Sequence, residues 1–344
     1  MTKIPSSILK QAFETNDTAT IVNALQYHVL KGTRPVSSLE EGITQEWESL
    51  STDPRFTTVQ GGQRVTTYRT ASNEVTFITG LGTRCTLLTA VYSTDYMARN
   101  MTDLLQDLTF GGGIVQIIDS PLTPPQDIVP TTSQYSLTSF QGALFAAKRT
   151  EALTAAKGIT IFVPNNDAFK ALGSAITQIT LEELSSVISY HVLANETIYS
   201  SELRNASTLT TAYGGQLTVL EYGNKLFINT AQITEKDILI KNGVIHAIDT
   251  VLNPSQKGPS PNPEVATQSA VWASAVSADS VPFTSAIPCS TACQPTGTAA
   301  SGGGGKWNAV RTTSSQGFAP METGFGGRAM GVAFAVVGGV GLLV

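Results

Sequence analysis

Two short sequence patterns recur in this chain and two further pairs of segments resemble each other, and the two sets follow the same order. The pairs are YHVL at 27–30 and 190–193, GGQ at 61–63 and 214–216, TFIT at 76–79 with LFINT at 226–230, and QDLTFGGGIVQIID at 106–119 with KDILIKNGVIHAID at 236–249. One such pair could arise by chance, but four collinear pairs predict a duplicated domain. The chain therefore has to be explained as two related folding units.

The two copies differ in length, and the spacing of the repeats places the domain boundaries. Most of the extra length of the first copy lies between Phe77 and Asp107. We interpret residues 80–105 as an insertion that runs over the surface. We expect a first domain at 1–125 and a second at 131–254.

The second copy contains a segment that has no counterpart in the first. GITIFVPNNDAFKAL, residues 158–172, reads as a strand, a turn and the start of a helix. The same spacing in the first copy would place this segment before Met1. We therefore expect the first domain to be truncated at its start, which would also explain why no secretory signal peptide begins the chain.

Composition limits the class of protein. Hydrophobic residues make up 41% of the chain and charged residues 14%, which predicts a buried core. A net charge of -5 provides no basic patch, so we predict no nucleic-acid partner. Cys85, Cys289 and Cys293 cannot all pair within one chain, although the last two are close enough to bridge. A C-x3-C pair without a nearby histidine is a weak metal pattern, and we predict no metal and no cofactor.

The C-terminal quarter has a different character. Residues 255–328 are rich in Ser, Thr, Pro, Ala and Gly and lack periodicity, which predicts a disordered, O-glycosylated stalk. Residues 329–344 are apolar and uncharged, and the order of small residues, polar spacer and apolar tail is typical of a glycosylphosphatidylinositol anchor signal. We expect attachment near Ser314, Ser315 or Gly317. A short tail anchor or an unstructured apolar end are the alternatives.

Two of the three histidines of the chain lie in the YHVL repeats. Thr180 and Glu183 form a capping-box pattern that predicts the start of a helix. His191 then continues the apolar stripe of that helix, and His28 has the same spacing in the first copy; the stripes are Leu184, Val187, Ile188 and His191, and Ile21, Ala24, Leu25 and His28. We predict buried histidines that hydrogen-bond to a neighbouring segment, with a ligand-facing role as the alternative.

The third histidine gives little support for catalysis. His246 lies in a predicted strand, and Gln116 takes its place in the first copy, which argues against a chemical centre shared by both domains. The chain has no G-x-S-x-G, H-E-x-x-H or C-x-x-C pattern, and no complete phosphate-binding loop. Scattered carboxylates leave an enzyme of that type open, but we predict a protein that is not an enzyme.

The predicted secretory route makes four sequons candidates for N-glycosylation. They are Asn16, Asn100, Asn195 and Asn205, each followed two residues later by Thr or Ser. Asn195 and Asn205 flank a segment that follows the helix carrying His191, which we expect to be a surface loop.

These residues together resemble the fasciclin (FAS1) domain family. ITIFVPNNDAF is similar to the first conserved box of the family, DILIKNGVIHAIDTVLNP to the second, and YHVL to its Tyr-His motif. The resemblance implies an α+β fold in each of two tandem domains, a small β-sandwich or barrel wedge with helices. In animal relatives the motifs have been linked to integrin binding, which would carry over to Tyr27, His28, Tyr190, His191, Asp237 and Ile238. The stalk and anchor signal are more similar to the fungal or plant branch, where integrins would not be the partner.

The sequence thus supports three functional hypotheses. The first is a non-enzymatic, lipid-anchored cell-surface protein that binds matrix or wall proteins or glycans. The second is a secreted or vacuolar enzyme or small-ligand carrier that uses a pocket of the second domain, which perturbed carboxylates around His246 would favour. The third is a soluble intracellular scaffold.

Overall fold

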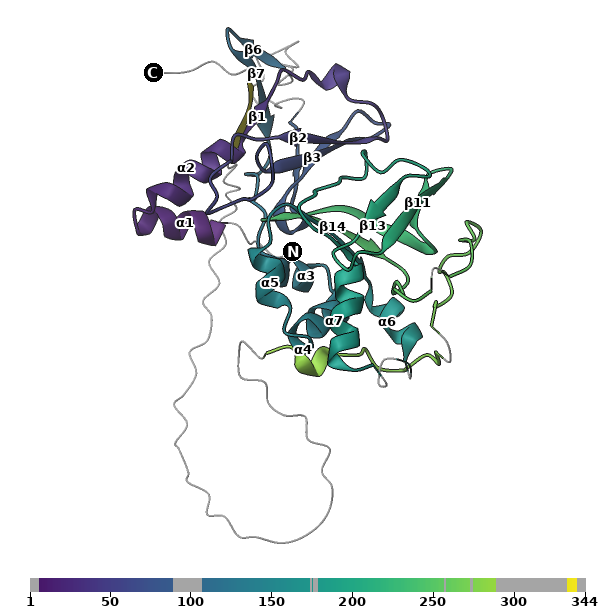
Figure 1. The fold of residues 1–344 in the computed structure, drawn as a ribbon. Helices are drawn as coiled ribbons and strands as arrows, with labels where there is room; N and C mark the ends of the chain where they lie inside the picture. The colour runs from purple at the N-terminus through teal and green to yellow at the C-terminus, as the bar shows by residue number, and fades with distance from the viewer. Residues whose placement is uncertain are drawn as a thin grey trace, which may run out of the picture. The chain divides into compact units, whose positions relative to one another are not determined.

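The computed structural model describes residues 6–88, 107–173, 175, 179–256, 258–272, 275–288 and 333–338 (Figure 1). Residues up to 287 belong to one compact unit, so the two predicted domains pack against each other. We call residues 6–125 the N-terminal half and residues 126–287 the C-terminal half. The boundary between two separate domains remains a prediction.

The N-terminal half combines two helices with a four-stranded antiparallel sheet of order β2-β3-β4-β5 and a second sheet of order β1-β15-β7-β6, in which β15 (Ala333–Gly338) comes from the C-terminal end of the chain. Its elements are α1 (Ser6–Glu14), α2 (Thr18–Tyr27), β1 (Val29–Lys31), η1 (Val36–Ser38), β2 (Thr44–Glu48), β3 (Arg64–Arg69), β4 (Val75–Ile78), η2 (Gly80–Gly82), β5 (Arg84–Thr86), β6 (Leu108–Phe110) and β7 (Gly113–Ile118).

The C-terminal half is built on a seven-stranded sheet of order β10-β11-β12-β13-β14-β8-β9. Its elements are α3 (Ile128–Gln134), α4 (Thr138–Ala146), α5 (Thr150–Ala155), β8 (Ile159–Pro164), α6 (Asn166–Leu172), α7 (Leu181–Tyr190), β9 (Val192–Leu193), β10 (Thr208–Thr210), β11 (Gln216–Tyr222), β12 (Lys225–Ile228), β13 (Ala231–Ile240), β14 (Gly243–Ile248) and η4 (Thr284–Ala286). In Figure 1, α3 to α7 gather on one side of β13 and β14. The mixture of helices and sheets confirms the predicted α+β class.

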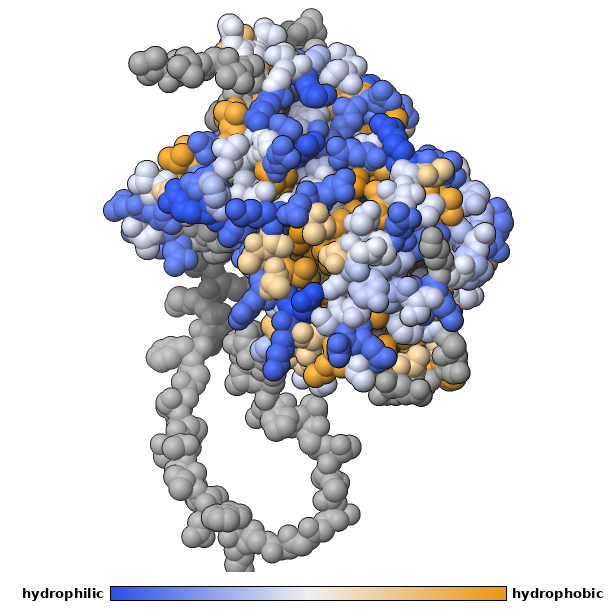
Figure 2. All heavy atoms as spheres, viewed as in Figure 1, coloured by the Kyte–Doolittle hydropathy of each residue, from blue (hydrophilic) through white to orange (hydrophobic). Residues whose placement is uncertain are grey.

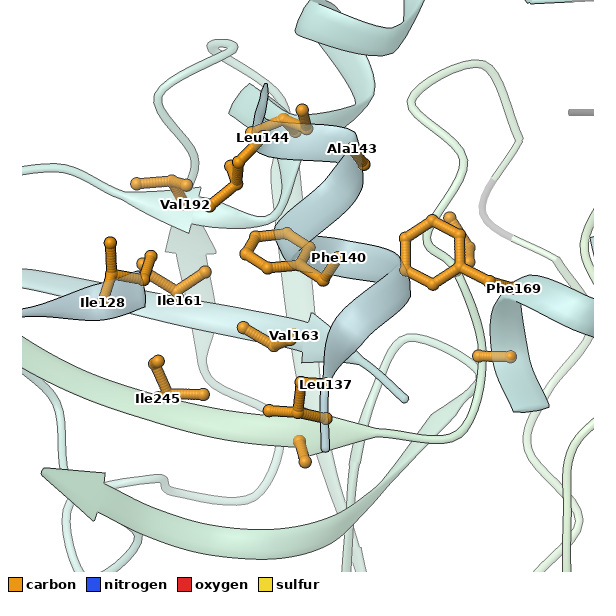
Figure 3. Packing of buried hydrophobic residues seen from close by; sticks show 14 of the residues in the cluster. Ile128, Leu137, Phe140, Ala143, Leu144, Ile161, Val163, Phe169, Val192 and Ile245 are labelled. Carbon is orange, nitrogen blue, oxygen red and sulfur yellow. The ribbon is translucent and has the colours of Figure 1, made fainter. Parts of the chain in front are cut away.

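The core of the C-terminal half shows why its apolar spacing leads to this arrangement. In Figure 3, α4 crosses β8 and β14, and Leu137 and Phe140 face Val163 and Ile245. These four side chains are at most 4% exposed. Burial of one such side chain stabilises the fold by about 1.5–3 kcal/mol. The predicted capping box of α7 is confirmed, since Thr180 accepts a hydrogen bond from the Glu183 N–H and Glu183 accepts one from the Thr180 N–H.

Part of the predicted insertion at 80–105 is instead core. Residues 84–86 form β5, which pairs with β4, and Cys85 is fully buried. The predicted surface excursion is therefore wrong for these residues, because β5 occupies the place that the beginning of β13 occupies in the C-terminal half. Residues 89–106 lie outside the described part of the chain.

The predicted disordered stalk at 255–328 is wrong for most of the described residues between 255 and 288. Asn253 Nδ2 donates to Val271 O at 3.0 Å, and Trp272 Nε1 donates to Val251 O at 3.2 Å. Phe283 packs edge-on against Phe169 with ring centroids 6.1 Å apart. The described residues between 255 and 288 are thus a strap on the C-terminal half, held by a few large apolar side chains within a polar segment. Residues 289–332 lie outside the described part.

Residues Ala333–Gly338, within the predicted anchor signal, form strand β15. It lies parallel to β1 and antiparallel to β7.

Figure 2 shows a largely hydrophilic face on which apolar residues gather near the centre.

Candidate functional site

His191 ends helix α7 and is hydrogen-bonded through both ring nitrogens. Its Nδ1 donates to Val187 O at 2.7 Å, and its Nε2 accepts the Leu252 N–H at 3.0 Å. The side chain is 1% exposed, and burial lowers the pKa of His191 to about 4. The neutral ring therefore links the end of α7 to the segment after β14.

The N-terminal half repeats this arrangement at His28. Its Nδ1 donates to Ala24 O at 2.7 Å, and its Nε2 accepts the Leu122 N–H at 2.9 Å. Burial lowers the pKa of His28 as well. Leu25 is 64% exposed, so its predicted place on a buried stripe is wrong. The equivalent Ile188 is buried in a core that α4 helps to form, whereas in the described part of the N-terminal half the helix in contact with α2 is α1.

The tyrosines of the two motifs are also used inside the fold. Tyr27 is fully buried and donates its hydroxyl to Arg64 O at 2.9 Å. Tyr190 is 3% exposed and donates to Gln216 O at 3.1 Å. Each tyrosine thus ties the end of its helix to the strand that follows the repeated GGQ.

Asp237 and Ile238, the second predicted motif, lie within β13 and are 3% and 2% exposed. Asp237 has a left-handed backbone with φ of 56°. Its carboxylate accepts the Ser200 N–H at 2.7 Å and the Ser200 hydroxyl. It therefore holds the loop that follows β9.

His246 completes this cluster, and Gln116 reproduces part of it. His246 Nδ1 accepts the Asp237 N–H at 3.3 Å, and Nε2 donates to Ile198 O at 2.9 Å. In the N-terminal half, Gln116 Oε1 accepts the Asp107 N–H at 3.2 Å. Gln can replace His here because this contact needs only an acceptor for a backbone N–H.

The tertiary structure brings further polar groups together where the halves meet. Gln63 is 1% exposed and donates to Ile240 O at 3.1 Å, although its repeat partner Gln216 is exposed. The Arg64 guanidinium carbon lies 4.8 Å from the centroid of the Tyr199 ring. The sequence did not identify Gln63, Arg64 or Tyr199 as members of a site. The repeat pattern does not distinguish the buried Gln63 from the exposed Gln216.

Glu46 carries the perturbed carboxyl of this junction. Its Oε2 accepts the Ser201 hydroxyl at 2.6 Å, whereas the buried Oε1 has no partner among the described residues. Desolvation, and then the nearby charge of Asp237, raise the pKa of Glu46 to about 7. Sequence analysis missed this site because Glu46 looks like an ordinary polar position in a strand.

We expect Glu46→Gln to stabilise the protein at pH 8. The folded-state pKa lies above the unfolded value of 4.5, so wild-type stability decreases as pH rises from 4.5 to 7. Allowing for solvent screening, the gain at pH 8 should be about 1–2 kcal/mol, and it should vanish near pH 4.5. Urea unfolding at both pH values measures this difference. The exposed Glu40→Gln serves as control, and an equal gain at both pH values would contradict the assignment.

A groove of about 610 Å³ lies beside this junction. Its walls come from residues 48, 58–61 and 64 of the N-terminal half and from residues 157–158, 195–197, 199 and 202 of the C-terminal half. It therefore differs from the pocket within the second domain that the sequence suggested.

The remaining predicted sites are spread over the surface or lie outside the described residues. Asn16, Asn195 and Asn205 are exposed, whereas Asn100 and the anchor candidates Ser314, Ser315 and Gly317 are not described, and neither are Cys289 and Cys293. The described residues contain no group of three side chains suited to hold a metal ion. Within the same part of the chain, no helix has the length and apolar character of a membrane span.

Comparison with known proteins shows that part of this chain is similar to the fasciclin domain family. The family model "Fasciclin domain" matches residues 135–254. A fasciclin-like arabinogalactan protein of Arthroderma benhamiae is 31% identical over 214 residues, which are 62% of this chain and 51% of that protein. Human periostin is 34% identical over 121 residues, or 34% of this chain and 14% of that protein.

A solved FAS1 domain pair of the insect cell adhesion molecule Fasciclin I is 15% identical, with a TM-score of 0.36, and the match covers 70% of this chain and 82% of that one. The chain spans about half the length of the Arthroderma relative. The matched segment contains α4, α7, His191 and Asp237 together with the strands that position them. Residues 135–254 of the chain match the fasciclin domain family.

Proposed function

We propose that this protein acts outside the cell as a non-enzymatic adhesion or wall-associated protein that binds surface or matrix proteins or glycans. The observation that carries the proposal is the use of all three histidines. Both ring nitrogens of His28, His191 and His246 bond to backbone groups. Acid–base catalysis by any of these histidines would break hydrogen bonds that stabilise the fold. We therefore assign the binding of partners to exposed loops and glycans.

The names of the relatives support the same role. The matches include fasciclin-like arabinogalactan proteins of fungi and periostin. On this proposal Tyr190, His191, Asp237 and Ile238 maintain the loops that contact a partner. Because these four side chains are at most 3% exposed, they do not form the contact surface.

The proposal also includes a lipid anchor that attaches near Ser314, Ser315 or Gly317. We expect phosphatidylinositol-specific phospholipase to release most of the protein from intact cells that display it. The released form should still bind the wall or matrix fraction of those cells. Retention after phospholipase treatment, with extraction by detergent alone, would contradict the anchor, whereas release without wall binding would contradict the adhesion role.

A small-ligand carrier is the second candidate, and Glu46 is the observation that favours it. Perturbed carboxyls mark functional sites in many proteins, and Glu46 lies near Asp237, whose backbone N–H bonds to His246. The carrier would use the junction between the halves. Specific retention of a small molecule through purification, lost in Glu46→Gln, would favour it.

A further inference from the structure

The residues that line the groove beside the junction include buried polar atoms that have no partner among the described residues. Thr58 Oγ1, Arg64 Nε and the Tyr199 hydroxyl are buried and bond to none of the described residues, and all three residues line the groove. Tyr199 is only 1% exposed. An unpaired buried polar group costs about 1–3 kcal/mol, so three of them in the walls of one groove favour an occupant that forms hydrogen bonds once the side chains of the walls turn toward it.

The charges of the groove indicate a neutral occupant. Glu48 is held by Lys31 at 3.2 Å and by Arg64 at 3.3 Å, so its charge is already balanced. Lys157, Glu196 and Glu202 also line the groove, so with Glu48 and its two partners three cations stand against three carboxylates. A ligand with hydroxyl and amide groups can both donate and accept, which suits a guanidinium N–H and two hydroxyls. Saccharides have this chemistry.

A sequon lies at the rim of the same groove. Asn195 and Thr197 both line it, and Asn195 is exposed with a left-handed backbone. The sequon loop is fixed to β8, because Thr160 donates its hydroxyl to Glu196 O at 2.9 Å and accepts the Ile198 N–H at 2.8 Å. A sugar on Asn195 would therefore start at the groove and have a high effective concentration there.

We propose that the groove holds the first sugar residues of an N-linked glycan on Asn195, which thereby joins the two halves. The inference rests on the proposed extracellular route. Attachment forms a bond from Asn195 Nδ2 to the anomeric carbon of an oligosaccharide supplied by a lipid-diphosphate donor. The lipid diphosphate leaves, and the amide loses one proton. The cavity volume of about 610 Å³ lies within the roughly 300–1,000 Å³ of ligand pockets.

The test compares sequon variants of the full chain, directed into the secretory route of a glycosylating host by that host's own signal peptide. Asn195→Gln and Thr197→Ala each remove the sequon, Thr197→Ser keeps it, and Asn205→Gln removes a sequon that does not line the groove. We expect hydrogen exchange of residues 56–64, which belong to the other half, to become at least several-fold faster in the first two variants only. Their melting temperature should fall by about 4 °C.

The outcomes separate this inference from the proposed function. A glycan on Asn205 with none on Asn195, or a glycosylated Asn195 whose removal leaves residues 56–64 unchanged, overturns the groove assignment alone. Faster exchange in Asn205→Gln to the same degree also overturns it. Unmodified Asn195 in mass spectra of the secreted protein would overturn this inference and leave the proposed extracellular function standing.

Discussion

His191→Ala should lower the stability of the protein by about 4 kcal/mol, or roughly 10 °C in melting temperature. The substitution leaves Val187 O and the Leu252 N–H unpaired in the core and opens a cavity between α7 and the segment after β14. Thermal and urea unfolding of the full chain measure the loss. His28→Ala is the matched variant of the other half, and it should cost less because His28 is only half-buried.

The pH dependence of His191→Ala distinguishes a buried neutral ring from a contact residue. Burial holds the folded-state pKa at about 4, below the unfolded value of 6.5, so the unfolded chain binds the proton first. Wild-type stability from this group is complete above pH 6.5 and decreases by up to about 3 kcal/mol as pH falls to 4. The stability of His191→Ala should not show this decrease between pH 6.5 and 4. Unchanged stability together with lost attachment to cells would make His191 a contact residue instead.

Asp237→Ala should cost about 3 kcal/mol. The carboxylate supplies the bonds that hold the Ser200 N–H and hydroxyl, and alanine is disfavoured at the left-handed φ of 56°. Asp237→Asn should cost about 1 kcal/mol, because an amide oxygen can still accept the Ser200 N–H and Asn tolerates this backbone. Urea unfolding of both variants tests the order.

Binding of the same Asp237 variants to the wall or matrix fraction gives the second readout. We expect attachment to decrease in proportion to the folded fraction, since the side chain is buried and acts through the Ser200 loop. If both variants remain as stable as the wild type and both lose attachment, Asp237 is a contact residue.

Local patterns in the sequence were sufficient where the determining contacts are close along the chain. The capping box of α7 and the phase that turns His191 inward depend on residues within one or two turns of a helix. The strand and helix start at 158–172 follow equally from local spacing and appear as β8 and α6. The resemblance of the boxes and the Tyr-His motif then identified the fasciclin fold.

The strap and the exposed Leu25 show where such patterns fail. Residues 255–287 have the composition of a linker, yet Val271, Trp272 and Phe283 pack on the C-terminal half. Leu25 has the spacing of a core residue, but a stripe is buried only where another element covers it. Composition and periodicity indicate which side chains of a segment could be buried. Whether they are buried depends on whether another element of the fold packs against them.

The sequence by itself thus determined the α+β class, the start of α7 with its inward-facing His191 and the resemblance to the fasciclin fold, since each depends on short-range spacing. Only the tertiary structure decided what the polar residues do. Burial, and then the charge of Asp237, raise the pKa of Glu46. Gln63 donates a hydrogen bond to Ile240 O, and Asn195 lines the same groove as Arg64 and Tyr199. Electrostatic and hydrogen-bond energies depend on distances through space, and residues that are remote in the sequence set those distances.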